Sequence, residues 1–460
     1  MSRDAAARLV TALLLTVLPP ALSAQVAEFT IPPNNLLPNY NRVSVGQREA
    51  LEAGAYVART DDALANWYNP AGLVQSEKTS LNASSNAYDL TKTTLNGIGQ
   101  KSSGTRFSPV GGFVGIVVGA PIARSPNWRF GFGYTKPVAW SPSDLDGSFS
   151  LPAGGGTEAF GYTSSSSFGT VIPSLNGAYR LSPTFRVGVG VGYAITTLNQ
   201  AQILSDRLVF PTAVTTGIQA LSTDGSVSHL LLTAGAQWDL GSAFTVGALI
   251  TSPGLRIGGS SKITYSNIVF QAGGAESDLA FRDTEAKFDY KIPLHATAGA
   301  AFRHSRGQVE LDVRYYGAQD EYDLYSSDST ATQITTDAAG APTIGNPVFT
   351  PVVNRARSFV SFALGANFSL SPAVRLHAGV FSDPSPVSAP SQSTFRAVDI
   401  TGVSGGVSLG SGRLSLSLGV SSSWGTTTER QVGPTLGGLA GTTDVSIKTF
   451  TGLYAVSFTF

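Results

Sequence analysis

The chain has 460 residues, of which 51 are glycine and none is cysteine, and 30 basic residues balance 30 acidic ones. Charged residues make up 13% of the chain, about half of the ~25% that is usual in soluble domains. This balance excludes a disordered chain and disfavours a polyanion-binding protein, which needs a basic surplus. Without cysteine there is no disulfide, no thiolate metal site and no cysteine nucleophile.

Residues 1–24 are predicted to be a secretory signal peptide. Arg3 and Arg8 form a basic start, residues 9–18 form a short apolar stretch, and the segment ends on the small residue Ala24. Elsewhere no apolar run reaches the ~18 residues of a transmembrane helix. We therefore expect an exported chain that is either soluble or embedded in a membrane by means other than helices.

Residues 25–76 lack the two-residue alternation that governs the rest of the chain. The part from Gly46 to Tyr68 is rich in helix formers, and Asp61 and Asp62 are placed to cap a short helix. Its Ala, Gly, Tyr and Trp residues suit packing inside a barrel lumen better than solvation. We therefore predict an N-terminal plug, or hatch, of short helices; the alternative is a flexible periplasmic extension.

From residue 77 onward, apolar and small residues alternate with a period of two, which is typical of strands with two different faces. Between Arg413 and Val420, leucine or valine stands at every second position, and serine or glycine stands between them. A soluble sandwich would carry Lys and Glu on the second face. Gly, Ser, Ala and Thr there indicate strands that face lipid on one side and a lumen on the other. Charge is scarce because a lipid-facing Lys or Arg costs about 2–4 kcal/mol at the midplane.

Six tight turns alternate with seven long polar connections along this stretch, which predicts fourteen strands. The turns lie at residues 125–127, 182–184, 240–242, 305–307, 371–373 and 410–412. The long connections lie near residues 90–108, 138–167, 201–224, 256–288, 323–354, 384–395 and 426–444. We therefore expect residues 77–460 to form an all-β, transmembrane antiparallel β-barrel, with both ends on the periplasmic side.

The last strand ends the chain on an aromatic residue. Tyr454, Val456 and Phe458 share one face with Phe460, and small residues separate them. Such an end resembles the recognition signal of outer-membrane barrels in Gram-negative bacteria. Phe460 is therefore predicted to engage the barrel assembly machinery.

The segment GQREALEAGAYVARTDDALANWYNPAGL, residues 46–73, resembles the N-terminal hatch of the FadL/TodX family, outer-membrane transporters for long-chain fatty acids and other hydrophobic compounds. Asn69, Pro70 and Ala71 match the Asn-Pro-Ala motif of that family, and Gly72 follows them. Weaker similarities occur in family order at residues 173–180, 292–295 and 381–386.

This resemblance implies passive uptake of hydrophobic molecules such as long-chain fatty acids or aromatic hydrocarbons. Ligand would be captured among the outer loops, move into a lumenal pocket, and be released when the hatch shifts. The family also implies a lateral exit into the membrane beside an inward kink of the third strand. That strand is expected at residues 127–140, and Pro137 is the candidate kink; alternatively, it opens the following loop.

Four charged or polar side chains on lumenal positions are candidate ligand contacts, because an inward arginine can receive a ligand carboxylate. They are His295, Arg303, Arg314 and Arg357. Glu310 and Asp312 share the inward face of Arg314. The alternative is that these charges pair with one another or with the hatch residues Asp61 and Asp62, since buried charges need partners.

Signals for enzyme chemistry are weak. Residues 402–406 fit G-x-S-x-G around Ser404, but a nucleophile elbow needs a strand-to-helix turn. The four histidines have no ligand spacing, so no metal or other cofactor is indicated. We predict no enzyme. The alternative function is an outer-membrane adhesin or receptor acting through its long extracellular loops, and the rival fold is a soluble secreted sandwich.

Overall fold

The computed structural model describes most of the chain after residue 26. The described residues are 27–31, 37, 39–40, 45–97, 100–119, 125–140, 145–153, 156–211, 213–272, 274, 276–388, 397–411, 413–432 and 440–460. The expected signal peptide, residues 1–24, lies outside these ranges. The described helices are α2 (Arg48–Leu51), α3 (Ala65–Tyr68) and the 3-10 helix η1 (Pro70–Gln75). In this part of the chain, no helix has the length and hydropathy needed to cross a membrane.

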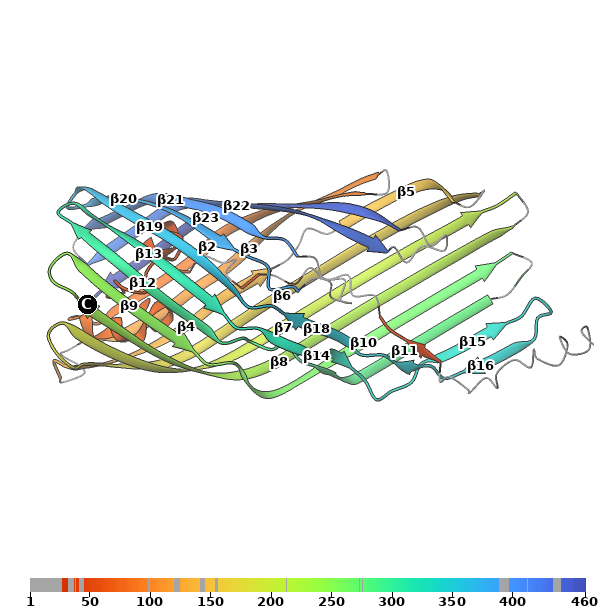
Figure 1. Ribbon diagram of the computed structural model, residues 1–460, viewed down its shortest axis with the longest axis horizontal. Helices are drawn as coiled ribbons and strands as arrows, with labels where there is room; N and C mark the ends of the chain where they lie inside the picture. Colours follow the sequence, from red (N-terminus) through yellow and green to blue (C-terminus); the bar gives the residue numbers. More distant parts are fainter. Residues whose placement is uncertain are drawn as a thin grey trace, which may run out of the picture.

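A closed antiparallel barrel of fourteen strands forms the body of the molecule, as the turn count predicted (Figure 1). The strands that run in one piece are β2 (Ser80–Gly97), β3 (Gln100–Val118), β4 (Trp128–Trp140), β6 (Gly156–Arg180), β7 (Phe185–Val209), β8 (Val214–Asp239), β20 (Val374–Asp383), β21 (Ile400–Ser411), β22 (Leu414–Val432) and β23 (Ala440–Thr459). The remaining barrel strands each consist of two pieces: β9 (Phe244–Thr251) with β10 (Leu255–Gln271), β11 (Glu276–Phe288) with β12 (His295–His304), β13 (Gly307–Tyr316) with β14 (Gln319–Ser326), and β18 (Val352–Ala356) with β19 (Phe359–Ser371). β2 pairs with β3 on one side and with β23 on the other, which closes the barrel.

Shorter strands extend the wall at the end of the barrel that carries the long connections. They are β5 (Leu145–Ala153), which pairs with β6, and β15 (Thr332–Thr336), which pairs with β11 and with β16 (Pro342–Gly345). The parallel pair of β1 (Glu28–Phe29) and β17 (Val348–Phe349) also belongs to this region. The barrel strands themselves begin and end together at the opposite rim, where Ser80 of β2 pairs with Thr459 of β23. The segment before the hatch therefore reaches the loop end of the molecule.

The predicted tight turns all separate consecutive strands, but the predicted long connections are wrong in extent. The segment 201–224 is mostly strand, because β7 runs to Val209 and β8 begins at Val214. The segments 256–288 and 426–444 are likewise largely occupied by β10 and β11 and by β22 and β23. Above the bilayer both strand faces are polar, so the hydropathy alternation fades while the backbone ladder continues.

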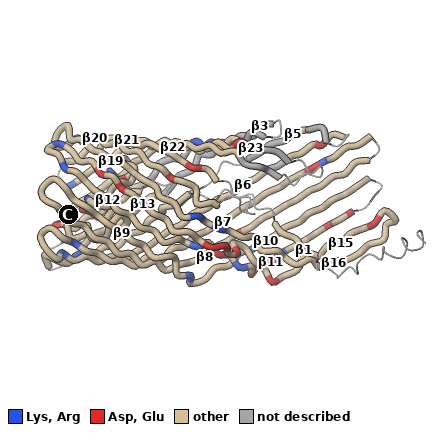
Figure 2. Tube along the Cα trace, in the orientation of Figure 1, with Lys and Arg blue, Asp and Glu red and all other residues tan. Residues whose placement is uncertain are grey.

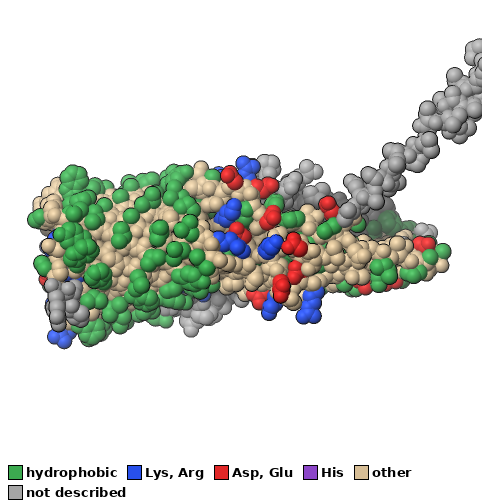
Figure 3. Space-filling model, turned by 90° about the horizontal axis from the view of Figure 1, so that it is seen from below, with side chains coloured by type: hydrophobic (Ala, Val, Ile, Leu, Met, Phe, Trp, Pro, Cys, Tyr) green, Lys and Arg blue, Asp and Glu red, His purple; other side chains and the backbone are tan. Residues whose placement is uncertain are grey.

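An apolar belt surrounds one half of the barrel's length. On β13, for example, Val309, Leu311 and Val313 are 44%, 47% and 45% exposed. Figure 3 shows such side chains covering one half of the visible face, and a band of Lys, Arg, Asp and Glu side chains bounds them. Figure 2 places charged residues mainly at the rim and beyond the belt. A closed barrel pairs its strands with one another and this one turns an apolar belt outward, so the chain is an integral outer-membrane barrel.

The lumen is filled from both ends. Near the rim with the tight turns, α2 contacts β20, β21 and β22, α3 contacts β4 and β6, and η1 contacts β4, β6, β7 and β8, so short helices plug the barrel as predicted. Toward the loop end, Phe29, Ile31 and Leu37 pack with inward side chains of the wall in a large buried apolar cluster. A cavity remains between these two fillings.

Candidate functional site

Asn69, the first residue of the predicted hatch motif, is fully buried and ties the hatch to the wall. Its Nδ2 donates to the backbone oxygens of Val57 (2.8 Å), Ala236 (3.0 Å) and Ala248 (3.3 Å). Its Oδ1 accepts from the N–H of Ala71 at 3.1 Å, which caps η1. The position suits asparagine because one short side chain both donates and accepts.

The rest of the motif is explained by close backbone approach. A Cβ on Gly72 would lie 2.3 Å from the carbonyl oxygen of Thr60, so only glycine fits there. Pro70 opens η1, and a Cβ on the wall residue Gly188 would lie 2.4 Å from the carbonyl carbon of Pro70. Other wall glycines whose Cβ would come within 2.5 Å of a hatch atom are Gly131, Gly235, Gly247, Gly299, Gly365, Gly379 and Gly419. The glycine-rich lumenal faces therefore leave the space that the hatch occupies.

Carboxylates on β13 bind the hatch backbone. Asp312 accepts from the N–H of Tyr56 at 3.0 Å, and Glu310 accepts from the N–H of Ala58 at 2.7 Å. Glu310 also pairs with Nε of Arg59 at 2.8 Å. Both carboxylates are almost fully buried, so they face the lumen as their alternation predicted. Both carboxylates therefore bind the hatch. Their partners are backbone amides and Arg59, and not Asp61 and Asp62, which were the hatch charges considered from the sequence.

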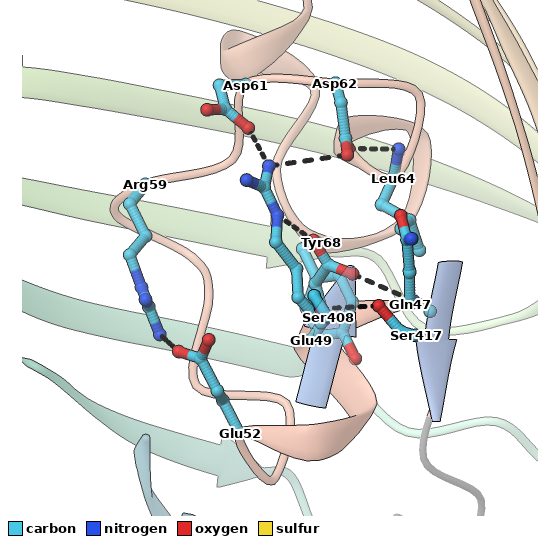
Figure 4. A network of polar contacts seen from close by, with 12 residues as sticks. Gln47, Glu49, Glu52, Arg59, Asp61, Asp62, Leu64, Tyr68, Ser408 and Ser417 are labelled. Carbon is cyan, nitrogen blue, oxygen red and sulfur yellow. Dashed lines mark hydrogen bonds and ion pairs between the residues drawn. The ribbon is translucent and has the colours of Figure 1, made fainter. Parts of the chain in front are cut away.

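Glu52 of the hatch is surrounded by its own set of partners. Arg59 forms a buried ion pair with it, drawn in Figure 4. Nδ1 of His377 lies 2.5 Å from Oε1 of Glu52, and Nδ2 of Asn367 donates to the same atom at 3.0 Å. Burial opposes ionisation, but Arg59 and His377 outweigh it and lower the pKa of Glu52. The hatch and the wall are thus joined by compensated buried charges.

Ser404, the centre of the G-x-S-x-G match, is another link between wall and hatch. It lies within the continuous strand β21, not at a strand-to-helix turn. Its Oγ donates to the carbonyl oxygen of Leu51 at 2.9 Å and accepts from the N–H of Ala53 at 3.0 Å. Its hydroxyl therefore holds the end of α2.

A second charged group lies on the side of the hatch that faces the tight turns (Figure 4). Arg48 pairs with Oε1 of Glu49 at 3.1 Å, with Oδ2 of Asp62 at 3.4 Å, and with Asp61. Asp62 also accepts from the N–H of Leu64 at 2.8 Å, but Leu64 is itself the N-cap residue of α3 and no side chain caps this helix, so the predicted cap by Asp61 or Asp62 is wrong. Burial, and then the nearby Asp62, raise the pKa of Glu49 to about 8. Three carboxylates share one guanidinium here, so one of them is readily protonated.

The cavity lies between the hatch and the wall. Its empty volume is about 1560 Å³, including the part that opens to solvent. Its lining is mostly apolar and includes the aromatic side chains of Tyr40, Trp67, Tyr68, Phe168, Tyr290, Tyr316 and Phe381. A few polar groups converge on it, among them Asn66, Asn176 and Asp312. Apolar lining with few polar groups is typical of a site for small hydrophobic molecules.

Two of the four predicted ligand contacts line this cavity. His295 is half-buried; its ring lies 4.6 Å from that of Tyr316, and its Nε2 lies 2.9 Å from Oγ1 of Thr297. Arg314 is buried and donates from Nη2 to the carbonyl oxygen of Gly54 at 2.7 Å. These two side chains give the aromatic cavity one polar end.

The other two predicted contacts lie elsewhere. Arg303 is exposed near the tight-turn end of β12, and Arg357 is exposed between β18 and β19. Arg357 pairs with Asp399 at 3.3 Å and donates to the carbonyl oxygen of Ser385 at 3.0 Å. Neither arginine lines the cavity described above. Alternation predicts the face on which a side chain lies but not its height along the barrel.

Sequence reasoning missed the aromatic residues that line the cavity. A signal existed for Tyr316, which continues the inward series of Arg314 at a position where small residues prevail. Trp67 and Tyr68 directly precede Asn69 in the hatch motif. Large aromatic rings on lumenal positions mark a place where the lumen is lined for binding.

The wall beside the cavity is irregular around Pro137. This residue lies inside β4, whose pairing with β6 shifts between Thr135 and Val138. β3 pairs with β4 only along residues 113–118 of the described chain, so residues 100–112 of β3 do not pair with β4. Pro137 and Val138 line the cavity. Pro137 thus stands within a strand, where two neighbouring strands part.

Comparison with solved structures shows the same architecture in known channels. The Pseudomonas putida toluene transporter TodX matches with a TM-score of 0.59 and 14% identity, over 91% of this chain and 99% of that chain. A Pseudomonas aeruginosa FadL homologue matches with 0.56 and 13%, over 92% and 99%. The CymD monoaromatic hydrocarbon channel matches with 0.53 and 17%, over 92% and 99%.

At these identities the likeness concerns the fold. No family model matches the sequence, and no curated protein matches it in a sequence search. The resemblance first seen in the hatch motif therefore holds for the architecture of the whole chain: a fourteen-stranded barrel plugged by an N-terminal hatch.

Proposed function

We propose that the protein is an outer-membrane channel for the passive uptake of hydrophobic small molecules, such as long-chain fatty acids or aromatic hydrocarbons. The observation that carries this proposal is the aromatic cavity between the hatch and the barrel wall. Structures of the same fold include a toluene transporter and a monoaromatic hydrocarbon channel. Entry of a hydrophobic ligand into such a cavity lowers the free energy because the apolar surface of the ligand leaves water.

The polar end of the cavity supports a role for His295 and Arg314 as ligand contacts. A fatty acid presents one carboxylate, and a guanidinium forms charge-assisted hydrogen bonds with it. Arg314 already donates to Gly54 of the hatch, so a carboxylate beside it would compete with a hatch contact. Ligand binding would thereby loosen the hatch locally, whereas an aromatic hydrocarbon would occupy only the apolar part.

Hatch movement is the second part of the proposal. The hatch is held by hydrogen bonds and ion pairs, including those of Asn69, Glu52 and Glu310, and by several small apolar clusters instead of one continuous apolar interface. Polar contacts of this kind can be exchanged for water without exposing much apolar surface. A small shift of the hatch would open the cavity toward the periplasm.

The third part is lateral exit at Pro137. β3 and β4 part beside this residue, and Pro137 and Val138 belong to both the wall and the cavity lining. An apolar ligand that leaves here enters the apolar core of the membrane and never meets water. This route suits compounds that partition strongly into lipid.

Uptake measurements test the proposal directly. The full-length chain is expressed in cells whose outer membrane lacks other routes for hydrophobic compounds, and uptake of labelled oleate and toluene is followed. We expect faster uptake of at least one of these than in cells carrying an empty vector. No gain for either compound, with the barrel present in the outer membrane, would refute the function.

A disulfide lock tests hatch movement separately. Ala55 of the hatch and Ala363 of β19 belong to one buried cluster, and the chain has no native cysteine to interfere. In an Ala55→Cys/Ala363→Cys variant, we expect oxidation to stop uptake and reduction to restore it. The reduced variant is its own control. Equal uptake by the oxidised, cross-linked protein would contradict hatch gating but not channel function.

A further inference from the structure

The barrel wall parts at a second place, between β10 and the strand formed by β11 and β12. The ladder between β9 and β12 ends at Thr251↔His295, and the ladder between β10 and β11 begins at Ser261↔Ala286. Between these points, residues 255–260 have no ladder partners on the neighbouring strand among the described residues. Six residues of strand span about 20 Å. The break is therefore long enough to interrupt the wall.

Proline and glycine explain this break. Pro253 and Pro293 cannot donate to a ladder, and they stand on the two facing strands between the paired regions. One described backbone hydrogen bond remains at the lower end of the break, from Gly254 to the carbonyl oxygen of Ile292 at 2.9 Å. The sequence thus places a ladder-breaking residue on each side of the break.

At the break, the strand of β11 and β12 bends into the lumen. A Cβ on Gly259 of β10 would lie 2.4 Å from the carbonyl oxygen of Phe288, and β11 contacts β8 behind β10. Ile292 shares its parity with the lipid-facing Ala298, yet it packs against Leu231 inside the barrel. The regular alternation is therefore reversed at Ile292, because the strand has turned inward.

The inward bend borders the cavity. Tyr290, Ile292 and Pro293 line it, opposite the hatch. Toward the loop end, Asn39 donates to the carbonyl oxygens of Asp383 (2.6 Å) and Val398 (2.9 Å), and the apolar cluster around Phe29 fills the lumen beyond. The described lumen is thus packed above the cavity and plugged below it. Both breaks in the wall lie beside the cavity, so they are candidate connections between the cavity and the membrane.

The rim of this break carries exposed apolar side chains and a charged pair next to one another. Leu255 and Ile257 of β10 are 52% and 61% exposed. Arg256 and Asp289 face each other across the break at 3.6 Å, and His229 of β8 lies 3.7 Å from the same carboxylate oxygen. Figure 2 marks charged residues along the chain near β8, β10 and β11, and Figure 3 shows a band of charged side chains where the apolar belt ends. This position corresponds to the boundary between acyl chains and headgroups of the outer leaflet.

We propose that this break is a lateral entry portal, through which hydrophobic compounds dissolved in the outer leaflet reach the cavity. Asp289, held loosely between Arg256 and His229, closes the portal without a ladder and can swing aside at low cost. Entry here and exit beside Pro137 would carry an apolar molecule from lipid to lipid through one cavity. The proposal rests on the proposed function, because it names the route by which the same cavity is filled.

Lipid accessibility tests the portal without any transport assay. Single cysteines are introduced in the otherwise cysteine-free chain at Ile292, at the inward Thr297 and at the lipid-facing Ala298, and each is labelled with bimane. The purified barrels are reconstituted with lipids that carry a nitroxide quencher on the acyl chain near the headgroup. We expect strong quenching at positions 292 and 298 and weak quenching at 297. Weak quenching at 292, as at 297, would overturn the portal whatever the protein transports.

A blocking substitution tests the route in cells. A Cβ on Gly258 meets no atom within 4 Å, so a side chain at this position begins in open space and Gly258→Trp places a large ring at the portal. Gly410, beside a tight turn, also has open space at its Cβ, so Gly410→Trp is the matched control. We expect Gly258→Trp to reduce the initial uptake rate severalfold and Gly410→Trp to leave it unchanged. Equal rates in both variants would overturn entry at this portal, whereas no uptake by the unaltered protein would overturn the proposed function instead.

Discussion

Two kinds of residue in the barrel wall hold the hatch: glycines, which leave space for it, and buried carboxylates, which bind it. Wall glycines allow the hatch backbone to approach, and buried carboxylates such as Glu310 and Asp312 then bind its amides. Burial of each carboxylate costs desolvation free energy, and hydrogen bonds from several donors offset that cost. The polar contacts therefore specify where the hatch sits, and they also make its seating sensitive to protonation.

Glu49 should make hatch seating depend on pH. In the seated hatch, burial raises its pKa from 4.5 to about 8, whereas a released, solvated Glu49 would titrate near 4.5. Between these values the seated form carries a proton that the released form lacks, so seating weakens as pH rises from about 5 to 8. Amide hydrogen exchange of α2 between pH 5 and 9, corrected for intrinsic rates, measures this change.

The control for this prediction is a carboxylate outside the hatch contacts. Glu49→Gln, which resembles the protonated form, should flatten the pH dependence of α2 protection. Glu77→Gln alters an exposed residue just before β2 and should preserve it. If Glu49→Gln left the pH profile unaltered, another group would govern seating.

At the scale of elements, the places where strands are interrupted shape the surroundings of the cavity as much as the continuous strands do. Proline stands at or beside two places where neighbouring strands part, in β4 and around β10 and β12, and both places border the cavity. A proline removes one ladder donor, so the neighbouring strand is released where the cavity needs access. We therefore expect these two interruptions to serve as passages for the ligand.

Pro137→Ala should narrow the opening between β3 and β4. Alanine restores a backbone donor and relaxes the restriction on φ, so β4 can pair more regularly with its neighbours. We expect a lower uptake rate for the variant, together with greater protection from hydrogen exchange in β4. Pro183→Ala, in the tight turn between β6 and β7, is the control and should not alter uptake. Unchanged uptake with a straightened β4 would argue against exit at this place.

At the scale of the whole molecule, we propose that the final strand guides assembly of the closed barrel. The chain ends at Phe460, which is 59% exposed, and its N–H donates to the carbonyl oxygen of Thr79 at 2.9 Å. Its ring lies 4.8 Å from that of Phe458. An exposed terminal ring contributes little to the folded barrel, so its value should lie in recognition during insertion.

Phe460→Ala should lower the amount of assembled barrel more than its stability. We expect less protein in the outer-membrane fraction, whereas the assembled part should unfold within about 0.5 kcal/mol of the unaltered barrel, as exposed substitutions usually do. Heat-dependent gel mobility measures both, because a closed barrel keeps its compact form in SDS until it is boiled. A stability loss as large as the loss of assembly would contradict a role in recognition.

Much of the candidate site could be predicted from the sequence. The part that could not be predicted has a physical cause. The burial of Glu310, Asp312 and Arg314 follows from a period of two along β13. The same argument placed Arg303 and Arg357 on lumenal positions, yet both are exposed and lie away from the cavity. Height along the barrel depends on strand length and stagger, which a local pattern does not contain.

The sequence by itself determined the class of fold, the strand number and the identity of the hatch, because each depends on local signals: alternation, tight turns and one motif. The tertiary structure decided which residues meet across the lumen. Glu52 and His377 are 325 positions apart, and no local pattern could pair them. The cavity and the breaks beside it likewise arise where strands distant in sequence fail to pair. Local sequence thus specifies the wall, and long-range packing specifies the path through it.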